Sequence, residues 1–170
     1  NIVDQIFIGQ GVGMLGNAAT NIAFPISIIC TATALMLGIG GATRFAICRA
    51  QNETQKGNQV FTASAAAGIT VGLVLLLVGA VGSDAVAKVL GAEGVIQEMT
   101  GSYLKTILGF APFFIMNNIL IAFVRNDGSP RLSMAAMLTG SFSNIVLDYI
   151  FLFPLNMGIF GAALATGFAP

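Results

Sequence analysis

The spacing of charged residues constrains this chain more than any other feature of its sequence. No Asp, Glu, Lys or Arg occurs between Asp4 and Arg44, a gap of 39 residues, and none occurs in the 27 residues from Gly57 to Ser83. Because about 20 apolar residues suffice to cross a bilayer, such runs predict membrane-spanning helices. Charged residues make up only 8% of the chain, against roughly 25% in a typical soluble domain. We therefore expect an all-α polytopic membrane protein in contact with the lipid bilayer.

The composition also excludes several kinds of function. The net charge is zero, which gives no support for a nucleic-acid partner. There is no His and there are only two Cys, so zinc sites, Cys-His pairs and Ser-His-Asp triads are unsupported. We expect no enzyme activity and no cofactor. Cys30 and Cys48 lie in or beside apolar runs, and we interpret them as free thiols within the membrane rather than as a disulfide.

Breaks in the apolar runs divide the chain into a helical bundle of four complete and two partial transmembrane helices. Pro25 and Pro112 are expected to kink or loosen the spans that contain them. Ser129 is a candidate N-cap with Pro130 at the first helical position, and residues 84–105 form an amphipathic connection. Both ends of the chain lie in apolar runs, so we expect a fragment of a longer protein, without a signal peptide. The expected helices are the end of a first at 1–9, four complete spans at 19–43, 57–83, 103–124 and 131–153, and the start of a sixth at 159–170.

The basic residues indicate how the chain is oriented. The loops at 44–56 and 125–131 are separated by two spans, so they are expected on the same side of the membrane. Together they hold five of the seven Lys and Arg residues. By the positive-inside rule, both loops are predicted to be cytoplasmic, in a plasma or inner membrane.

One acid lies deep inside an apolar run. Asp148 follows Asn144 by four residues in the segment Asn144–Phe153, so a helix places the two side chains on one face. A carboxylate at this depth costs several kcal/mol if it is ionised and unpaired. The pair predicts a small polar site, and the alternative is a structural acid satisfied by Asn144 alone.

Two more polar residues are expected at the same depth. From the expected helix ends, Asp4, Asp148 and Thr166 each lie roughly 8–10 Å below the outer surface, at 1.5 Å per residue. With Asn144 they supply two carboxylates, an amide and a hydroxyl, which suit Na⁺, H⁺ or both in competition. The alternative for Asp4 is a solvated position near the interface. Asn117 and Asn118 lie nearer the cytoplasmic side, where one is expected to line a cavity.

Several segments resemble the multidrug and toxic compound extrusion (MATE) family, particularly its bacterial branch with DinF-like and MepA-like proteins. They occur in the family's order and span nearly the whole chain. The segments are Val3-Asp4-x-x-Phe7-Ile8-Gly9, Arg125-x-Asp127-Gly128-x-Pro130, Asn144-Ile145-x-Leu147-Asp148-x-Ile150-Phe151 and Gly158-x-x-Gly161-Ala162-Ala163-Leu164-Ala165-Thr166.

The resemblance implies one lobe of a twelve-helix fold, with a second six-helix lobe of the same chain missing. It implies Na⁺- or H⁺-coupled antiport that exports small amphipathic, often cationic, organic compounds. Asp4, Asn144, Asp148 and Thr166 match the family's cation site, and Asn118 matches a residue lining the cavity. Alternatives are a lipid-linked saccharide flippase of the same superfamily, which is expected to line its cavity with cationic residues, and a non-transporting membrane scaffold.

Overall fold

The computed structural model describes residues 2–169. Asn1 and Pro170, the outer limits of the first and last expected helices, lie outside these residues. The described part of the chain is helical apart from short turns, which confirms the expected all-α fold. Its helices are α1 (Ile2–Gly11), α2 (Met14–Ala50), α3 (Thr54–Val89), α4 (Gly94–Gly109), α5 (Ala111–Asn126), α6 (Pro130–Leu152) and α7 (Gly158–Phe168).

The long helices extend beyond the expected spans at both ends. α2 has 37 residues and α3 has 36, because the polar residues that follow each apolar run are compatible with a helix. The helices end only where the backbone turns through positive φ, at Asn52 and Gly91. The connection expected at 84–105 is accordingly short, since α3 reaches Val89 and α4 begins at Gly94. The position of the bilayer along these helices remains a prediction.

A proline breaks the fourth expected span, as predicted. α4 and α5 meet at Phe110 with a bend of 49°. Pro112 lacks the N–H that would bond to the carbonyl of Leu108, and its ring crowds that carbonyl. Pro25, by contrast, lies inside α2, which continues through it.

α6 begins at Pro130 after Ser129, as expected, although the Ser129 side chain makes no capping hydrogen bond within the described residues.

The distribution of side-chain sizes is that of a membrane bundle. Large apolar residues such as Leu77, Phe113 and Phe142 are exposed, whereas Ala19 and Ala34 of α2 are fully buried. Small residues inside allow close approach of helices, and large residues outside suit lipid tails. Among residues 2–169, three helices are long and apolar enough to cross a membrane, or four if the bent pair α4–α5 forms one span.

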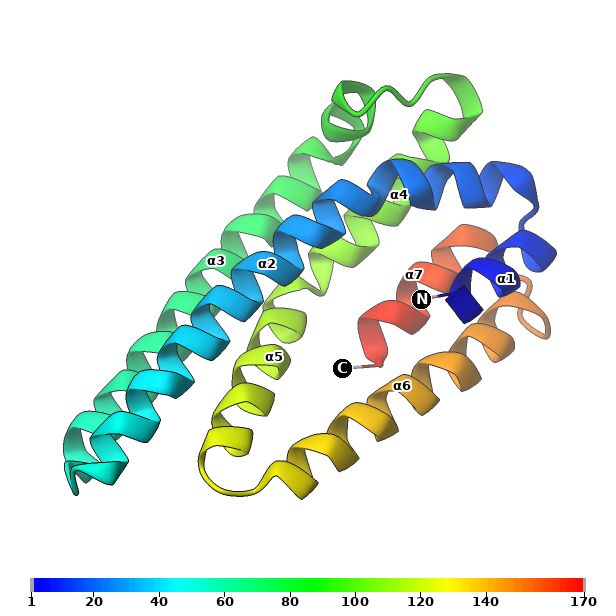
Figure 1. Ribbon diagram of the computed structural model, residues 1–170. Helices are drawn as coiled ribbons and strands as arrows, with labels where there is room; N and C mark the ends of the chain where they lie inside the picture. Colours follow the sequence, from blue (N-terminus) through cyan, green and yellow to red (C-terminus); the bar gives the residue numbers. More distant parts are fainter. Residues whose placement is uncertain (1, 170) are drawn as a thin grey trace.

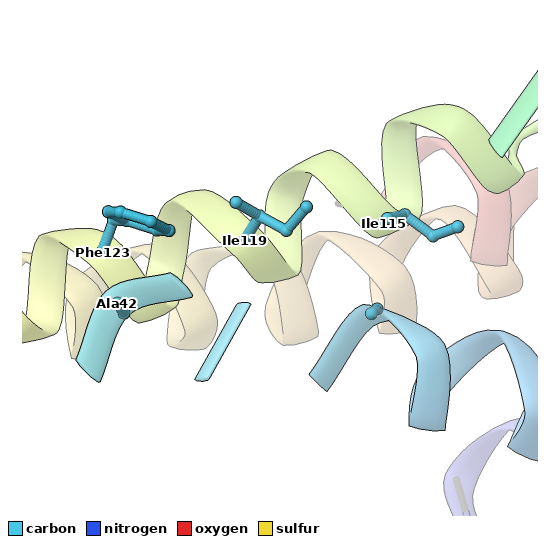
Figure 2. Packing of buried hydrophobic residues seen from close by; sticks show 5 residues of the cluster. Ala42, Ile115, Ile119 and Phe123 are labelled. Carbon is cyan, nitrogen blue, oxygen red and sulfur yellow. The ribbon is translucent and has the colours of Figure 1, made fainter. Parts of the chain in front are cut away.

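The main core lies where α5 packs on α2. Ile115, Ile119 and Phe123 follow one another at four-residue intervals along one face of α5 and are almost completely buried against Ala34 and Ala42 of α2. Figure 2 shows these side chains in a row above Ala42. This packing fixes α5, which carries several of the residues described below, against the longest helix of the protein.

The helices form two groups. α2, α3, α4 and α5 pack on one another, and α1, α6 and α7 pack on one another. In Figure 1, α6 diverges from the first group, and α1 and α7 lie between them near the upper end of α6. Contacts of α7 with α4 and of α6 with α5 join the groups.

The turns expected on one side of the membrane do lie at one end of the molecule. The α2–α3 and α5–α6 turns both lie at the lower end in Figure 1. Arg49 at the end of α2 forms an ion pair with Asp127 in the α5–α6 turn. The two turns therefore lie at the same end of the molecule, and the side of the membrane that they face stays a prediction.

Candidate functional site

Helix α6 places an amide and an acid on its inward face. Asp148 is completely buried and Asn144 is 8% exposed, one helical turn apart. Apart from the neighbouring Asp4 carboxyl group, neither carboxyl oxygen of Asp148 meets a hydrogen-bond partner in the described part of the chain. Buried polar atoms are normally paired, so the Asp148 carboxyl group is available to a proton or a cation.

Helix α1 brings a second acid to the first. Asp4 interacts electrostatically with Asp148 across the contact between α1 and α6. The ring of Phe7 fixes that contact through edge-on packing against Tyr149 and Phe153, with centroid distances of 6.5 and 6.0 Å. Two facing carboxylates repel when both are charged, so a bound cation or a shared proton stabilises the pair.

Helix α7 supplies a hydroxyl group. The Thr166 hydroxyl donates its proton to the carbonyl oxygen of Ala162 at 3.1 Å, which leaves its oxygen lone pairs able to accept a proton or to coordinate a cation. Gly161, Ala162 and Ala165 are buried, and their small size lets α7 approach its neighbours closely. Thr166 thereby shares a cavity with Asp4 and Asn144.

This cavity has a volume of about 300 Å³, and half of its lining residues are polar. Both Asn117 and Asn118 line it. The Asn118 amide nitrogen donates to the carbonyl oxygen of Phe114 at 2.9 Å, so its amide oxygen is the group left for a ligand. We call it the amide cavity; its polar lining residues are Asp4, Asn117, Asn118, Ser141, Asn144 and Thr166.

A second cavity of about 170 Å³ adjoins the first and is mainly apolar. We call it the aromatic cavity; it is lined by Asp4, Phe24, Ser27, Cys30, Thr31, Tyr103, Ile107, Phe110, Ala111, Phe114, Thr166 and Gly167. Asp4 is its acidic residue and Thr166 one of its hydroxyls. An anionic group among aromatic rings suits an organic cation, because the rings attract positive charge as well as apolar surface.

Tyr103 is the main residue of the site that the sequence analysis did not identify. It lies on α4, lines the aromatic cavity, and interacts electrostatically with both Asp4 and Asp148. Its place in the site depends on how the helices pack, which the sequence does not reveal. The only signal for Tyr103 in the sequence is that the chain has just two tyrosines.

The structure therefore brings the sequence-predicted residues together. Asp4, Asn144 and Thr166 line one cavity, and Asp148 joins them through Asp4. Carboxylate, amide and hydroxyl oxygens are ligands that hard cations prefer. Cys30 and Cys48 are both free thiols, as expected, with Cys30 in the aromatic cavity.

Comparison with known proteins agrees with this arrangement. The model of the MatE family matches residues 1–150. "Multidrug export protein MepA" of Staphylococcus aureus (strain MRSA252) is 34% identical over 149 residues, covering 88% of this chain and 33% of that protein. The protein of the same name from Staphylococcus saprophyticus is 32% identical over 159 residues, covering 91% and 35%. The chain thus spans about a third of the length of these relatives.

Solved structures give the same result for the fold. A MOP superfamily transporter from Pyrococcus furiosus matches with a TM-score of 0.92 at 29% identity, covering 99% of this chain and 37% of that one. The MATE multidrug transporter DinF-BH matches with a TM-score of 0.90 at 33% identity, covering 99% and 38%. This coverage fits one lobe of a MATE transporter, and the family is one of transporters rather than enzymes. The chain is a multi-pass membrane protein that belongs to the MatE family.

Proposed function

We propose that the protein takes part in secondary active transport, exporting small amphipathic or cationic organic compounds in exchange for Na⁺ or H⁺. The observation that carries this proposal is the buried Asp148 carboxyl group, which faces Asp4 and meets no other hydrogen-bond partner among residues 2–169. Such a group inside a membrane protein is costly and is typical of ion pathways. The names of the relatives, multidrug export proteins and a multidrug transporter, support the export of organic compounds.

Competition for one acid explains how the ion and the compound exclude each other. Asp4 lines both the amide cavity and the aromatic cavity. A cation held by Asp4, Asp148 and their neighbours neutralises the charge that an organic cation needs. Each ligand therefore favours the conformation in which the other is absent, which is the requirement for antiport.

The two alternatives receive less support. No Lys or Arg is among the residues that line either cavity within the described chain, whereas a flippase for lipid-linked saccharides needs cations to bind a pyrophosphate. A scaffold has no use for two facing acids inside the membrane. The basic turns at 44–56 and 125–131 are proposed to face the cytoplasm from a plasma membrane.

Replacing Asp148 by Asn tests the proposal. The amide has the shape of the acid but carries neither its charge nor its exchangeable proton, so Asp148→Asn is expected to abolish ion-coupled export while the protein still inserts. The measurement is ethidium efflux from cells that contain the complete protein, with Na⁺ present or absent, at two pH values. This also distinguishes Na⁺ from H⁺ as the driving ion.

Glu98→Gln is the matched control, because Glu98 is exposed on α4 and the same loss of charge there should leave efflux unchanged. The amount of each variant in the membrane is compared by immunoblot. Full efflux by Asp148→Asn at a normal membrane level would contradict the proposal.

A further inference from the structure

Phe114 lines both the aromatic cavity and the amide cavity. In the described part of the chain only three residues line both of them, Asp4, Phe114 and Thr166. Asp4 and Thr166 are polar and belong to the cation site proposed above. Phe114 is the apolar member of the shared wall, and no role has yet been assigned to it.

The cavities that Phe114 separates differ in chemistry. On one side lie the rings of Phe24, Tyr103 and Phe110 with Ile107. On the other side lie the amides of Asn117, Asn118 and Asn144 and the hydroxyl of Ser141. The aromatic cavity favours the apolar body of an organic cation, whereas the amide cavity favours water and a hydrated ion.

The surroundings of Phe114 hold it in place. It lies on the first turn of α5, directly after the break at Phe110, and its carbonyl oxygen accepts the hydrogen bond from Asn118. The next residue, Ile115, is fully buried against α2 and α3. The backbone of Phe114 is therefore anchored to the group formed by α2, α3, α4 and α5, and its ring lines both cavities from there.

We propose that Phe114 is a specificity-determining residue that partitions the site into an organic compartment and an ion compartment. The inference rests on the transport function proposed above. The ring keeps the apolar body of an organic cation in the aromatic cavity, while the coupling ion reaches Asp4 through the amide cavity.

Two serines allow a direct test, because Ser27 lines only the aromatic cavity and Ser141 only the amide cavity. Each is replaced by cysteine, singly, in the complete protein after Cys30→Ala and Cys48→Ala remove the native thiols. The rate of modification by a small methanethiosulfonate is measured in membranes with and without ethidium. At an ethidium concentration about ten times its dissociation constant, occupancy should slow the reaction of a covered thiol about tenfold.

With Phe114 present, ethidium is expected to protect the thiol of Ser27→Cys and to leave that of Ser141→Cys unprotected. Adding Phe114→Ala joins the compartments, so ethidium should then protect both thiols. Phe113→Ala is the matched control, because Phe113 precedes Phe114 on α5 but is 69% exposed and should leave the protection pattern unchanged.

The outcomes separate the partition from the transport function. Equal protection of both thiols with Phe114 in place would overturn the partition and leave transport intact, and this comparison needs no variant at position 114. Unchanged protection in a folded Phe114→Ala protein would also overturn it. If ethidium protects neither thiol and is not exported, the transport proposal itself fails.

Discussion

The contribution of the Thr166 hydroxyl group to ion binding can be measured separately from that of the side chain's shape. Thr166→Val keeps the shape and removes the oxygen, so the proposed cation site loses one ligand. We expect the concentration of the driving ion that gives half-maximal export to rise about tenfold, which corresponds to about 1.4 kcal/mol. Efflux at a series of Na⁺ concentrations, or of pH values if H⁺ drives export, measures this concentration.

Thr166→Ser is the control, because it restores the oxygen and its hydrogen bond to Ala162. It should return the ion dependence close to that of the unaltered protein. If Thr166→Val showed the same half-maximal ion concentration as Thr166→Ser, the hydroxyl would have no part in ion binding.

Single residues differ in how well the sequence predicts them. Asn144 and Asp148 could be placed on one face of α6 because a helix has a fixed period. Phe113 and Phe114 are adjacent and chemically identical, yet Phe113 is 69% exposed and Phe114 lines both cavities. No local pattern distinguishes them, because the difference depends on which helices pack against α5.

Helix α3 needs a glycine to pack closely against the start of α5. A Cβ atom added at Gly72 would lie 2.5 Å from the Cα atom of Pro112 and 3.0 Å from its nitrogen. These are backbone atoms, which cannot move aside without separating α3 from α5. Gly72→Ala is therefore expected to destabilise the protein by about 1–3 kcal/mol.

Gly82 provides the comparison within the same helix, since a Cβ atom there would meet nothing within 4 Å. Gly82→Ala should be neutral, or should stabilise α3 by up to about 1 kcal/mol through the higher helix propensity of Ala. The temperature at which each variant of the complete protein aggregates in detergent measures the difference. Equal temperatures for the two variants would show that α3 and α5 are not held by this contact.

The sequence contains a spacing that permits this close approach but does not identify the partner helix. Gly68 and Gly72 lie four residues apart, which allows a neighbouring helix to come near. In the structure both glycines face the α5 segment, at Ile119 and Pro112. The spacing describes one helix surface, and the identity of the opposing helix depends on the fold of the whole chain.

At the scale of the molecule, the site lies where the two helix groups meet. Asp4, Asn144, Asp148 and Thr166 all belong to α1, α6 and α7, whereas Tyr103, Phe114, Asn117 and Asn118 belong to α4 and α5. In the proposed function, an ion therefore binds mainly to one group and an organic compound contacts both, so that occupancy at one site can change how the two groups are arranged. The sequence predicts one depth for Asp4, Asp148 and Thr166, but the contact between α4 and α7 has no signature in the sequence.

The orientation of the whole molecule in the membrane can also be tested. Both turns at the end marked by Arg49 and Asp127 are rich in basic residues, which are retained on the cytoplasmic side during insertion. Single cysteines in place of the exposed residues Gln51 and Asn126, in a complete protein without native thiols, should resist a membrane-impermeant maleimide in intact cells and react only after lysis. Cysteines in place of the exposed Glu93 and Asn156 should react in intact cells, because their turns lie at the opposite ends of α3 and α6. The reverse pattern would show that the charge bias of these two turns does not set the orientation.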